Sequence, residues 1–394
     1  MKTHSAFRLQ LLLSGLCFGW GFALTAQAAT PATAVPIREG LRLTLPPTIY
    51  AVPGVPMNLH FANVVLATPD EAPAFNIECG IGKTLAKHWT LTATPAQAGR
   101  HPLSLQVSCP PSHAQEKAQT VVQVVPHDAG KNQDIALLMV GDSLTHASLY
   151  PNEVARLLAL PGNPKWRMLG THHPASAVKS VAHEGYGGWT WVRFNTLFNR
   201  ERPMPGYTNS SPFVAATGPQ QQPQIDVTHY ITEHCGGHAP DFVTFLLGIN
   251  DCFRLKADNP AALDAGITEM LQQADLLLAA FHKAAPKAEL GVGLTTPGNI
   301  RDGAFVANYK QQYSRANWRA VQHRLVERQL AHFRGREAEG IFIVPTELNL
   351  DILAGYPDNN AVHPNAAGYQ QIGASFYSWL KWRLAEHDRL AAAK

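Results

Sequence analysis

Between residues 39 and 127 the apolar positions form short runs that Pro, Gly and Asn interrupt. Runs such as HWTLTATP and HPLSLQVSC alternate apolar with other residues, as strands do when one face is buried. Turn-forming residues recur at roughly ten-residue intervals, a spacing typical of sandwich proteins. The pattern therefore predicts a small, immunoglobulin-like antiparallel β-sandwich over 39–127, without a helix of useful length.

The hydrophobic pattern changes at residue 133, where continuous apolar runs alternate with longer helical stretches. The runs IALLMV, FVTFLLG, LGVGLTT and IFIVPTE suit strands of a parallel sheet that helices cover on both faces. Helical spacing follows at 259–286, 308–333 and 364–387. The alternation predicts a doubly wound α/β domain over 133–394, with its ligand site beyond the carboxyl ends of the strands.

The first 28 residues have the three-part pattern of a secretory signal peptide. Lys2 and Arg8 precede a long apolar stretch, and the small residues of AQA end at Ala28, where we expect cleavage. An uncleaved membrane anchor is the alternative, because the stretch is about as long as a short spanning helix. Cys17 lies inside the stretch and follows a leucine, which argues against a lipoprotein anchor. With residues 29–38 as a linker rich in Ala, Pro and Thr, we predict a secreted or periplasmic protein without a membrane span after cleavage.

Export changes how the cysteines are interpreted, because an oxidising compartment favours disulfides. Four cysteines remain beyond the signal peptide, and four allow three pairings. Proximity in the sequence favours Cys79 with Cys109 and Cys235 with Cys252. No C-x-x-C spacing indicates a metal site, and the histidines are scattered, so we expect no metal and no cofactor.

The charge balance argues against one class of partner. Charged residues make up 15% of the chain, and the formal net charge is +3, of which Lys2 and Arg8 in the signal peptide contribute two. Without a long run of like charge, no basic face for nucleic acid is expected.

Four short segments place reactive or small residues where predicted strands end or a helix begins. They are GDSL at 141–144, EGYGGWTW at 184–191, LGIND at 247–251 and NAVHPNAAGY at 360–369. Turn and cap chemistry also explains each segment alone. Their joint occurrence, in this order, indicates a site.

In these segments the chain from about residue 133 to residue 394 resembles the SGNH (GDSL-type) hydrolase superfamily. Its members are esterases, lipases, thioesterases and carbohydrate O-acetylesterases. The resemblance implies a three-layer α/β/α, flavodoxin-like fold with a five-stranded parallel sheet. It also implies that Ser143 is the nucleophile and His363 the base, and that Ser143, Gly188 and Asn250 form the oxyanion hole. The N-terminal β-sandwich lies outside the resemblance.

These residue types suit ester cleavage for physical reasons. A serine hydroxyl is a poor nucleophile until a base such as an imidazole takes its proton. The tetrahedral intermediate needs donors fixed in advance, which the backbone N–H groups of Ser143 and Gly188 and the Asn250 amide can supply. A glycine at 188 lets its N–H approach the substrate without a Cβ, although Gly185 and Gly187 are alternative donors.

The sequence departs from the family pattern at position 360. The family usually has an Asp three residues before the histidine, and this chain has Asn360. An Asn oxygen accepts the Nδ1–H bond but supplies no negative charge, and in a serine protease triad that change costs about 10⁴ in turnover. Three interpretations stay open. Asn360 or a carbonyl orients the histidine; Asp358, Glu347 or Asp351 replaces the missing acid; or the domain is not catalytic.

Two roles are open for Tyr186, Trp189 and Trp191, which lie in the second segment. They stack on a sugar ring at the rim of the site, or they fill the core. The acidic neighbours Asp142 and Asp251 fit turn or cap positions better than chemistry.

We therefore expect an exported serine ester hydrolase, specifically a carbohydrate O-acetylesterase that works through an acyl-enzyme on Ser143. Its partner is a small-molecule or polysaccharide ester. The alternatives are a lipid or aryl esterase, an O-acetyltransferase, or a non-catalytic protein whose β-sandwich binds a glycan. The segment 194–225 is too polar and proline-rich for the apolar lid of a lipase, and we predict a long loop there that shapes the pocket.

Overall fold

A computed structural model describes residues 40–67, 72–110, 112–206, 209–216 and 221–393 of the chain. The predicted signal peptide (1–28) and linker (29–38) lie outside the described residues. In the described part of the chain, no helix is both long enough and apolar enough to cross a bilayer.

A parallel sheet forms the centre of the α/β region. Its strand order is β11-β10-β15-β16-β17, and β12 pairs with the end of β10 beyond the reach of β11. This is the flavodoxin-like order: the second strand, β11, lies on one side of β10, and β15, β16 and β17 follow on its other side. The strands are β10 (Asp134–Gly141), β11 (Lys165–Leu169), β12 (Glu184–Gly185), β15 (Phe242–Leu246), β16 (Glu289–Gly293) and β17 (Ile341–Val344). All but the first residue of β10 are buried, as its unbroken apolar sequence requires.

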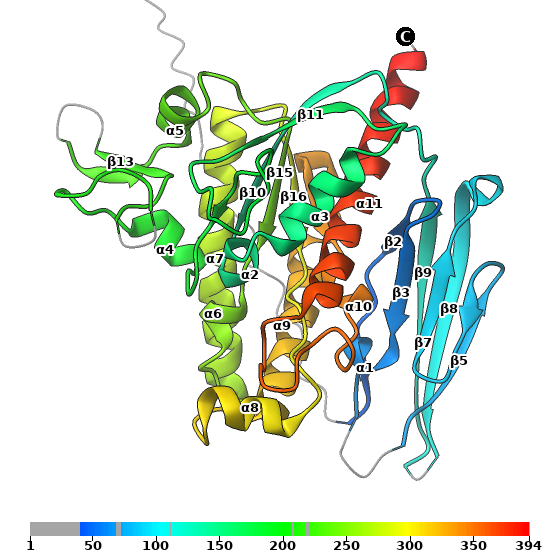
Figure 1. Cartoon of the computed structure of the whole chain (residues 1–394). Coiled ribbons are helices and arrows are strands. Elements are labelled where there is room, and N and C mark those ends of the chain that lie inside the picture. Colours follow the sequence, from blue (N-terminus) through cyan, green and yellow to red (C-terminus); the bar gives the residue numbers. More distant parts are fainter. Residues whose placement is uncertain (1–39, 68–71, 111, 207–208, 217–220, 394) are drawn as a thin grey trace, which may run out of the picture. The chain divides into compact units, whose positions relative to one another are not determined.

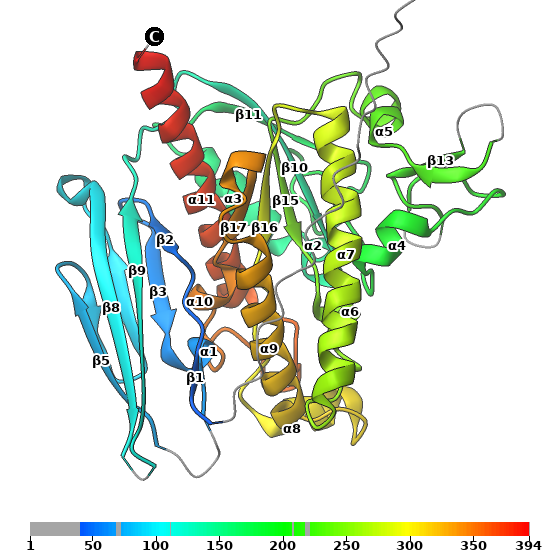
Figure 2. The same cartoon turned by 180° about the vertical axis from the view of Figure 1, so that it is seen from behind.

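Helices cover both faces of this sheet. Figure 1 shows α3 and α11 in front of the strands, and Figure 2 shows α7 and α9 on the opposite side. The long helices therefore complete a three-layer α/β/α fold. The helices of this region are α2 (Ser143–His146), α3 (Leu149–Leu158), α4 (Trp191–Thr196), α5 (Val227–His234), α6 (Ile249–Cys252), α7 (Pro260–Ala284), α8 (Asp302–Tyr309), α9 (Arg315–Phe333), α10 (Thr346–Asn349) and α11 (Ala366–Ala392), with a 3₁₀ turn, η2, at Glu337–Glu339.

The N-terminal region is rich in strands, and its main sheet has the order β2-β9-β8-β5. In β8 and β9 buried residues alternate with more exposed ones, which is why the sequence pattern reveals them. One pairing differs from the predicted antiparallel arrangement, because β2 runs parallel to β9. The elements are β1 (Arg42–Leu43), β2 (Thr48–Ala51), β3 (Pro56–His60), α1 (Phe61–Val64), β4 (Val65–Leu66), β5 (Ala74–Cys79), β6 (Lys83–Thr84), β7 (His88–Thr92), η1 (Pro95–Gln97), β8 (Gly99–Cys109) and β9 (Ala114–Val124).

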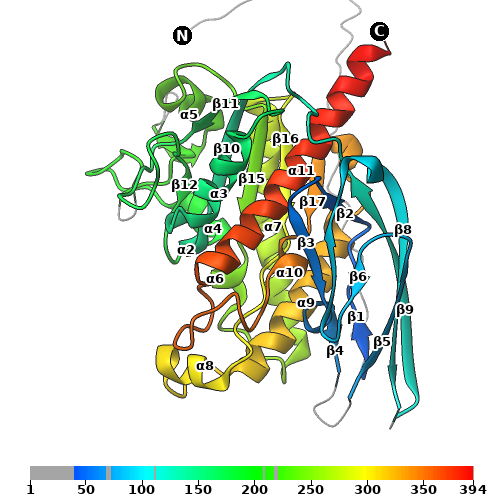
Figure 3. The same cartoon turned by 45° about the vertical axis from the view of Figure 1, so that its right-hand side comes forward.

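The strand-rich region packs against the α/β region through α10 and α11 (Figure 3). Tyr50 of β2 stacks on Trp382 of α11, with 4.8 Å between ring centroids. The Asn63 side chain donates to the Glu347 and Leu350 carbonyls, both at 2.7 Å. These contacts hold the segment that leads from α10 toward residue 363.

The predicted disulfides are wrong, since no bridge joins the cysteines of the described residues. Cys79 lies opposite Leu103 in the β5–β8 ladder, six residues along β8 from Cys109. Six residues of strand span about 20 Å, whereas a disulfide needs Cα atoms within about 7 Å. Cys252 instead packs its Sγ 3.9 Å from Met270 Sδ, and Cys235 caps the end of α5.

The segment 194–225 has more structure than the predicted loop. Its described residues include the end of α4 and an antiparallel pair, β13 (Val214–Ala216) and β14 (Pro223–Ile225).

Candidate active site

Ser143 is the first residue of α2, and only Asp142 separates it from the end of β10. The Asp142 carboxylate caps this helix by accepting from the Leu144 N–H at 2.9 Å. Gly141 allows the turn to close, because a Cβ there would lie 2.0 Å from Thr145 Oγ1. The turn therefore presents a half-buried serine hydroxyl at the carboxyl end of the sheet.

His363 lies on the loop between α10 and α11, next to this serine. Its Nε2 is 2.8 Å from Ser143 Oγ, although 220 residues separate the two in the sequence. The loop ends at Asn365, whose side chain caps α11 by accepting from the Gly368 N–H. Folding thus forms the serine–histidine pair that the first and fourth segments predict.

Asn360 lies beside the histidine, at the position where the family pattern usually has an Asp. Its Oδ1 accepts from the backbone N–H groups of Val362 (3.3 Å) and His363 (3.0 Å), so the oxygen and not the amide nitrogen faces the histidine. The same oxygen lies 3.2 Å from His363 Nδ1, which must therefore carry the proton and donate. This tautomer leaves the Nε2 lone pair directed at Ser143 Oγ.

Two of the three acidic alternatives to Asn360 form contacts elsewhere, and the third is buried. Asp358 is 89% exposed and pairs with Arg301 at 3.2 Å, while the Asp351 carboxylate accepts from two backbone N–H groups of its own turn. Glu347 is buried in α10, where desolvation raises its pKa to about 8. Among the described residues, no hydrogen bond joins any of the three to His363.

Burial lowers the pKa of His363 below its ordinary value of 6.5. A lower pKa keeps the imidazole neutral, and therefore able to accept a proton, in weakly acidic solution.

Asn250, from the third segment, contacts residues of the first and second segments. It lies in α6, which follows β15, and its Nδ2 donates to the Trp189 carbonyl at 3.0 Å. The contact from the same nitrogen to Asp142 Oδ2 is longer, at 3.4 Å. One amide hydrogen is thus weakly held, beside the turn that carries Ser143.

Gly188 is an exposed residue in the turn that ends at Trp189, and its φ of +76° lies in the left-handed region. A Cβ there would meet nothing within 4 Å. The left-handed backbone conformation by itself therefore favours glycine at this position. The alternative donor Gly185 is occupied, because its N–H donates to His183 Nδ1 at 3.1 Å.

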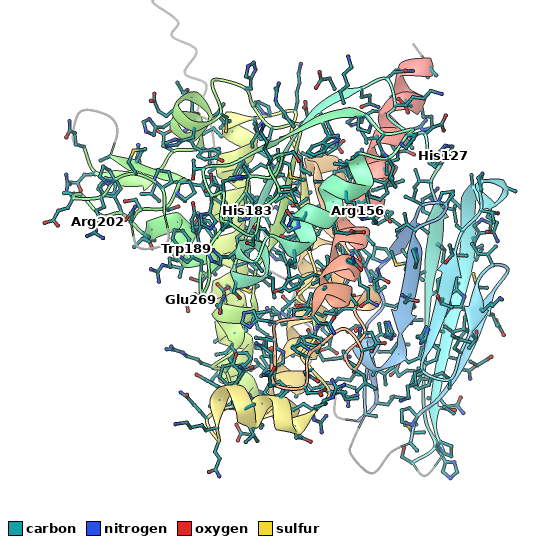
Figure 4. All side chains as sticks on the ribbon, viewed as in Figure 1. His127, Arg156, His183, Trp189, Arg202 and Glu269 are labelled. Atoms are coloured by element: carbon teal, nitrogen blue, oxygen red, sulfur yellow. The ribbon has the colours of Figure 1, made fainter. Side chains whose placement is uncertain are left out.

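The stacking role for Tyr186, Trp189 and Trp191 is wrong. The three side chains are at most 1% exposed, so none presents a face to a ligand. The Tyr186 hydroxyl donates to Glu184 at 2.6 Å, and Trp189 packs against Tyr186 with 4.4 Å between centroids. They form the core beneath the second segment, where Figure 4 labels Trp189 and His183.

Glu184 ties this core together. Its buried carboxylate accepts from the hydroxyls of Tyr186 and Tyr230 and from the N–H and hydroxyl of Thr171. Burial nevertheless raises its pKa. Nothing in the spacing of the sequence distinguishes Glu184 from an ordinary strand residue, so its role is not predictable from the sequence.

A second serine–histidine contact, Ser148 Oγ to His183 Nε2 at 2.9 Å, is not a second catalytic pair. His183 Nδ1 accepts from the Gly185 N–H, so Nε2 must carry the proton and donate to Ser148. Burial lowers the pKa of His183 to about 3, which keeps this tautomer neutral.

In the part of the chain that the structure describes, no three or more His, Cys, Asp or Glu residues are arranged to hold a metal.

Asn299 holds the histidine loop and was also missed from sequence. Its Nδ2 donates to the carbonyls of Pro357 (2.8 Å) and Asn360 (2.9 Å), and its N–H donates to the Ala361 carbonyl (2.8 Å). The residue follows β16, at the same edge of the sheet as Ser143 and Asn250. Its position after a strand is the only signal that the sequence offers.

Replacing Asn299 by Ala is expected to lower kcat by about 10²-fold, since small misplacements of reacting groups have effects of that size. The unfolding free energy should fall by about 1–3 kcal/mol, because two partly buried carbonyls lose their donors. Asn299→Asp is the matched variant, because it keeps the acceptor for Arg301 N–H but loses both donors. An unchanged kcat with a lower melting temperature in both variants would show that Asn299 serves stability alone.

A family model described as the GDSL-like Lipase/Acylhydrolase family matches residues 139–371, a range that contains all four segments. Solved structures with similarity include the M. smegmatis aryl esterase (13% identity, 63% of this chain and 99% of that chain, TM-score 0.36). A protein described as a GDSL-like lipase from Parabacteroides merdae has 16% identity, covering 65% of this chain and 99% of its own, with a TM-score of 0.34. A gut microbial diltiazem-metabolizing enzyme has 13% identity, covering 65% and 47%, with a TM-score of 0.37. Comparison with curated proteins gives no match.

Proposed function

Because the chain belongs to the GDSL-like lipase/acylhydrolase family, whose activity is hydrolysis of esters, we propose that it is a serine esterase working through an acyl-enzyme on Ser143. The observation that carries this proposal is the 2.8 Å contact between Ser143 Oγ and His363 Nε2, with Nδ1 held by Asn360. A nucleophile in contact with a base whose other nitrogen is oriented is the arrangement that acyl transfer requires.

In the acylation step, Ser143 Oγ attacks the ester carbonyl carbon while its proton passes to His363 Nε2. The tetrahedral intermediate collapses when the C–O bond to the alcohol breaks, and His363 returns the proton to the departing alcohol oxygen. The acyl group is then an ester of Ser143. Asn360 Oδ1 keeps the imidazole in the required tautomer throughout, through the Nδ1–H bond.

The negative charge of the intermediate needs donors in place before the reaction. We assign this role to the backbone N–H groups of Ser143 and Gly188 and to the weakly held hydrogen of Asn250 Nδ2. In the second half of the reaction, His363 takes a proton from water as the water oxygen attacks the acyl carbonyl, and the Ser143 ester bond breaks as His363 returns the proton to Ser143 Oγ. The products are a carboxylic acid and the free serine.

The proposed substrate is an O-acetyl group on a carbohydrate, and the proposed location is the periplasm or the medium. Export is supported by the charged, apolar and small-residue pattern of residues 1–28. The strand-rich region of 42–124 is an accessory region outside the range of the family match. An exported enzyme with an accessory region suits an extracellular polymer as substrate.

The test is release of acetate from a panel of acetylated polysaccharides and from p-nitrophenyl acetate. The mature wild type is expected to release acetate, and Ser143→Ala, folded by its circular dichroism spectrum, is expected to release none. Release that persists in Ser143→Ala would overturn the serine mechanism. Release from p-nitrophenyl acetate but from no saccharide would overturn the carbohydrate assignment alone.

Asn360→Asp is expected to raise kcat about tenfold, because a hydrogen bond to a charged partner is about 1–1.5 kcal/mol stronger than one to a neutral partner. The added charge stabilises the imidazolium and therefore raises the pKa of His363, which in the wild type is lowered by burial. Activity needs neutral His363, so the acidic limb of the pH profile should move to higher pH in Asn360→Asp. Profiles of kcat/KM for both proteins provide the measurement, and an unmoved limb would contradict the assignment of His363 as the base.

A further inference from the structure

An aromatic cluster lies between α6, α8 and the start of α9. It consists of Phe253, Tyr309 and Tyr313, packed over Trp318. Ring centroids lie 5.1 Å apart for Phe253 and Tyr309, 4.8 Å for Phe253 and Tyr313, and 5.3 Å for Tyr309 and Tyr313. Trp318 lies 5.0 Å from Phe253 and is 2% exposed, while the other three rings are only half-buried.

Two features of the chain connect the cluster to the proposed active site. Phe253 follows Asn250 by three residues, which places both on the same side of one helical turn, and its N–H donates to the Ile249 carbonyl. Asn308, the neighbour of Tyr309, accepts the Ala361 N–H at 2.6 Å, two residues before His363. Figures 1 and 3 show α6, α8 and the loop before α11 together at one end of the α/β region.

The cluster is held on a fixed frame. The Asn317 side chain accepts from the Ala257 N–H at 3.0 Å and donates to the Leu255 carbonyl at 2.9 Å, which ties the start of α9 to the segment after Phe253. Trp318 packs so closely on Gly298 that a Cβ there would lie 2.7 Å from its Cδ1. Trp318 and the segment after Phe253 therefore form a fixed base for the cluster.

We propose that this aromatic cluster binds a sugar ring in the alcohol part of the ester, beside the acetyl group that Ser143 receives. The inference rests on the proposed esterase function and deepens it. Half-buried aromatic faces pack against the C–H faces of a sugar. The polar residues around them (Asn308, Gln311, Gln312 and Ser314) are exposed, and their side chains match hydroxyl groups better than a lipid chain. The Tyr309 hydroxyl is protonated at neutral pH, as tyrosine ordinarily is, and can donate a hydrogen bond; burial raises its pKa further.

The experiment compares three acetyl esters: a mixture of acetylated gluco- and xylo-oligosaccharides, ring-free glycerol triacetate, and p-nitrophenyl acetate. Tyr309→Ala and Tyr313→Ala are each expected to lower kcat/KM on the oligosaccharides about three- to tenfold, mainly through KM. Activity on glycerol triacetate should stay within about twofold of wild type. Val306→Ala, an exposed position on the same helix, is the control and should change neither.

When the wild type is active, each other outcome overturns the inference in a recognisable way. Equal losses on all three esters would mean that the substitutions disturb the active site itself, and a loss confined to p-nitrophenyl acetate would indicate an aryl alcohol as the ligand. Unchanged activity on the oligosaccharides would exclude the cluster as a subsite. If the wild type cleaves no ester, the esterase proposal fails separately. Calorimetric titration of the full chain with the same oligosaccharides then decides whether the cluster binds sugar, with weaker binding by Tyr313→Ala expected and no binding by the wild type contradicting it.

Discussion

Replacing Ser143 by Ala, or His363 by Ala, is expected to lower kcat by about 10⁴–10⁶ on any ester that the wild type cleaves. The two side chains share one proton, because Ser143 Oγ and His363 Nε2 are 2.8 Å apart. Without the hydroxyl no acyl-enzyme forms, and without the imidazole the hydroxyl keeps its proton. The measurement is kcat of each variant under saturating substrate, with the melting temperature as a check on folding.

The double variant tells whether the pair acts as a unit. Residues that act as a unit show strongly non-additive losses, so Ser143→Ala with His363→Ala should be little worse than either alone. Ser148→Ala is the matched control, because it removes the other serine hydroxyl that contacts a histidine. It should keep most activity, since His183 donates to Ser148 and cannot act as its base. A loss in Ser148→Ala as large as in Ser143→Ala would contradict this assignment.

Asn250→Ala is expected to lower kcat by about 10²–10³, the effect of removing one donor from an oxyanion hole. The effect should appear in kcat more than in KM, because the donor acts where charge develops in the intermediate. Its side chain also donates to the Trp189 carbonyl, so the melting temperature must be measured alongside.

A structural role and an electrostatic one can be separated at this position. Asn250→Asp keeps the size of the side chain but removes its donors and adds charge near Asp142, so it should be at least as inactive as Asn250→Ala. If both variants lose stability and keep kcat, the oxyanion role of Asn250 fails.

The segments at the ends of the strands were predictable, because chemistry at the edge of a parallel sheet uses residues that stand out against apolar runs. Ser143 begins the short helix that follows β10, and Asn250 lies in the short helix after β15. The tautomer that Asn360 imposes on His363 was open at sequence level. The tautomer follows from two backbone N–H groups that donate to Asn360 Oδ1, and these groups take up their positions only in the folded loop.

Other features depend on tertiary packing that sequence spacing does not encode. Cys79 and Cys109 looked suited to a bridge because they are close in the sequence, yet the register of β5 on β8 sets them far apart. The aromatic residues of the second segment are as suited to a core as to a sugar, and burial decided for the core. Asn299 and Asn308 contact the loop that carries His363, although both lie outside the four motifs.

The most direct test of the account is reaction of the folded wild type with a fluorophosphonate, followed by peptide mapping by mass spectrometry. Attack by Ser143 Oγ on phosphorus expels fluoride and leaves a stable phosphonyl ester. The account predicts a single adduct, on the peptide that contains Ser143, with much slower labelling in His363→Ala. An adduct on a different residue, or no adduct on a protein shown to be folded, would contradict it.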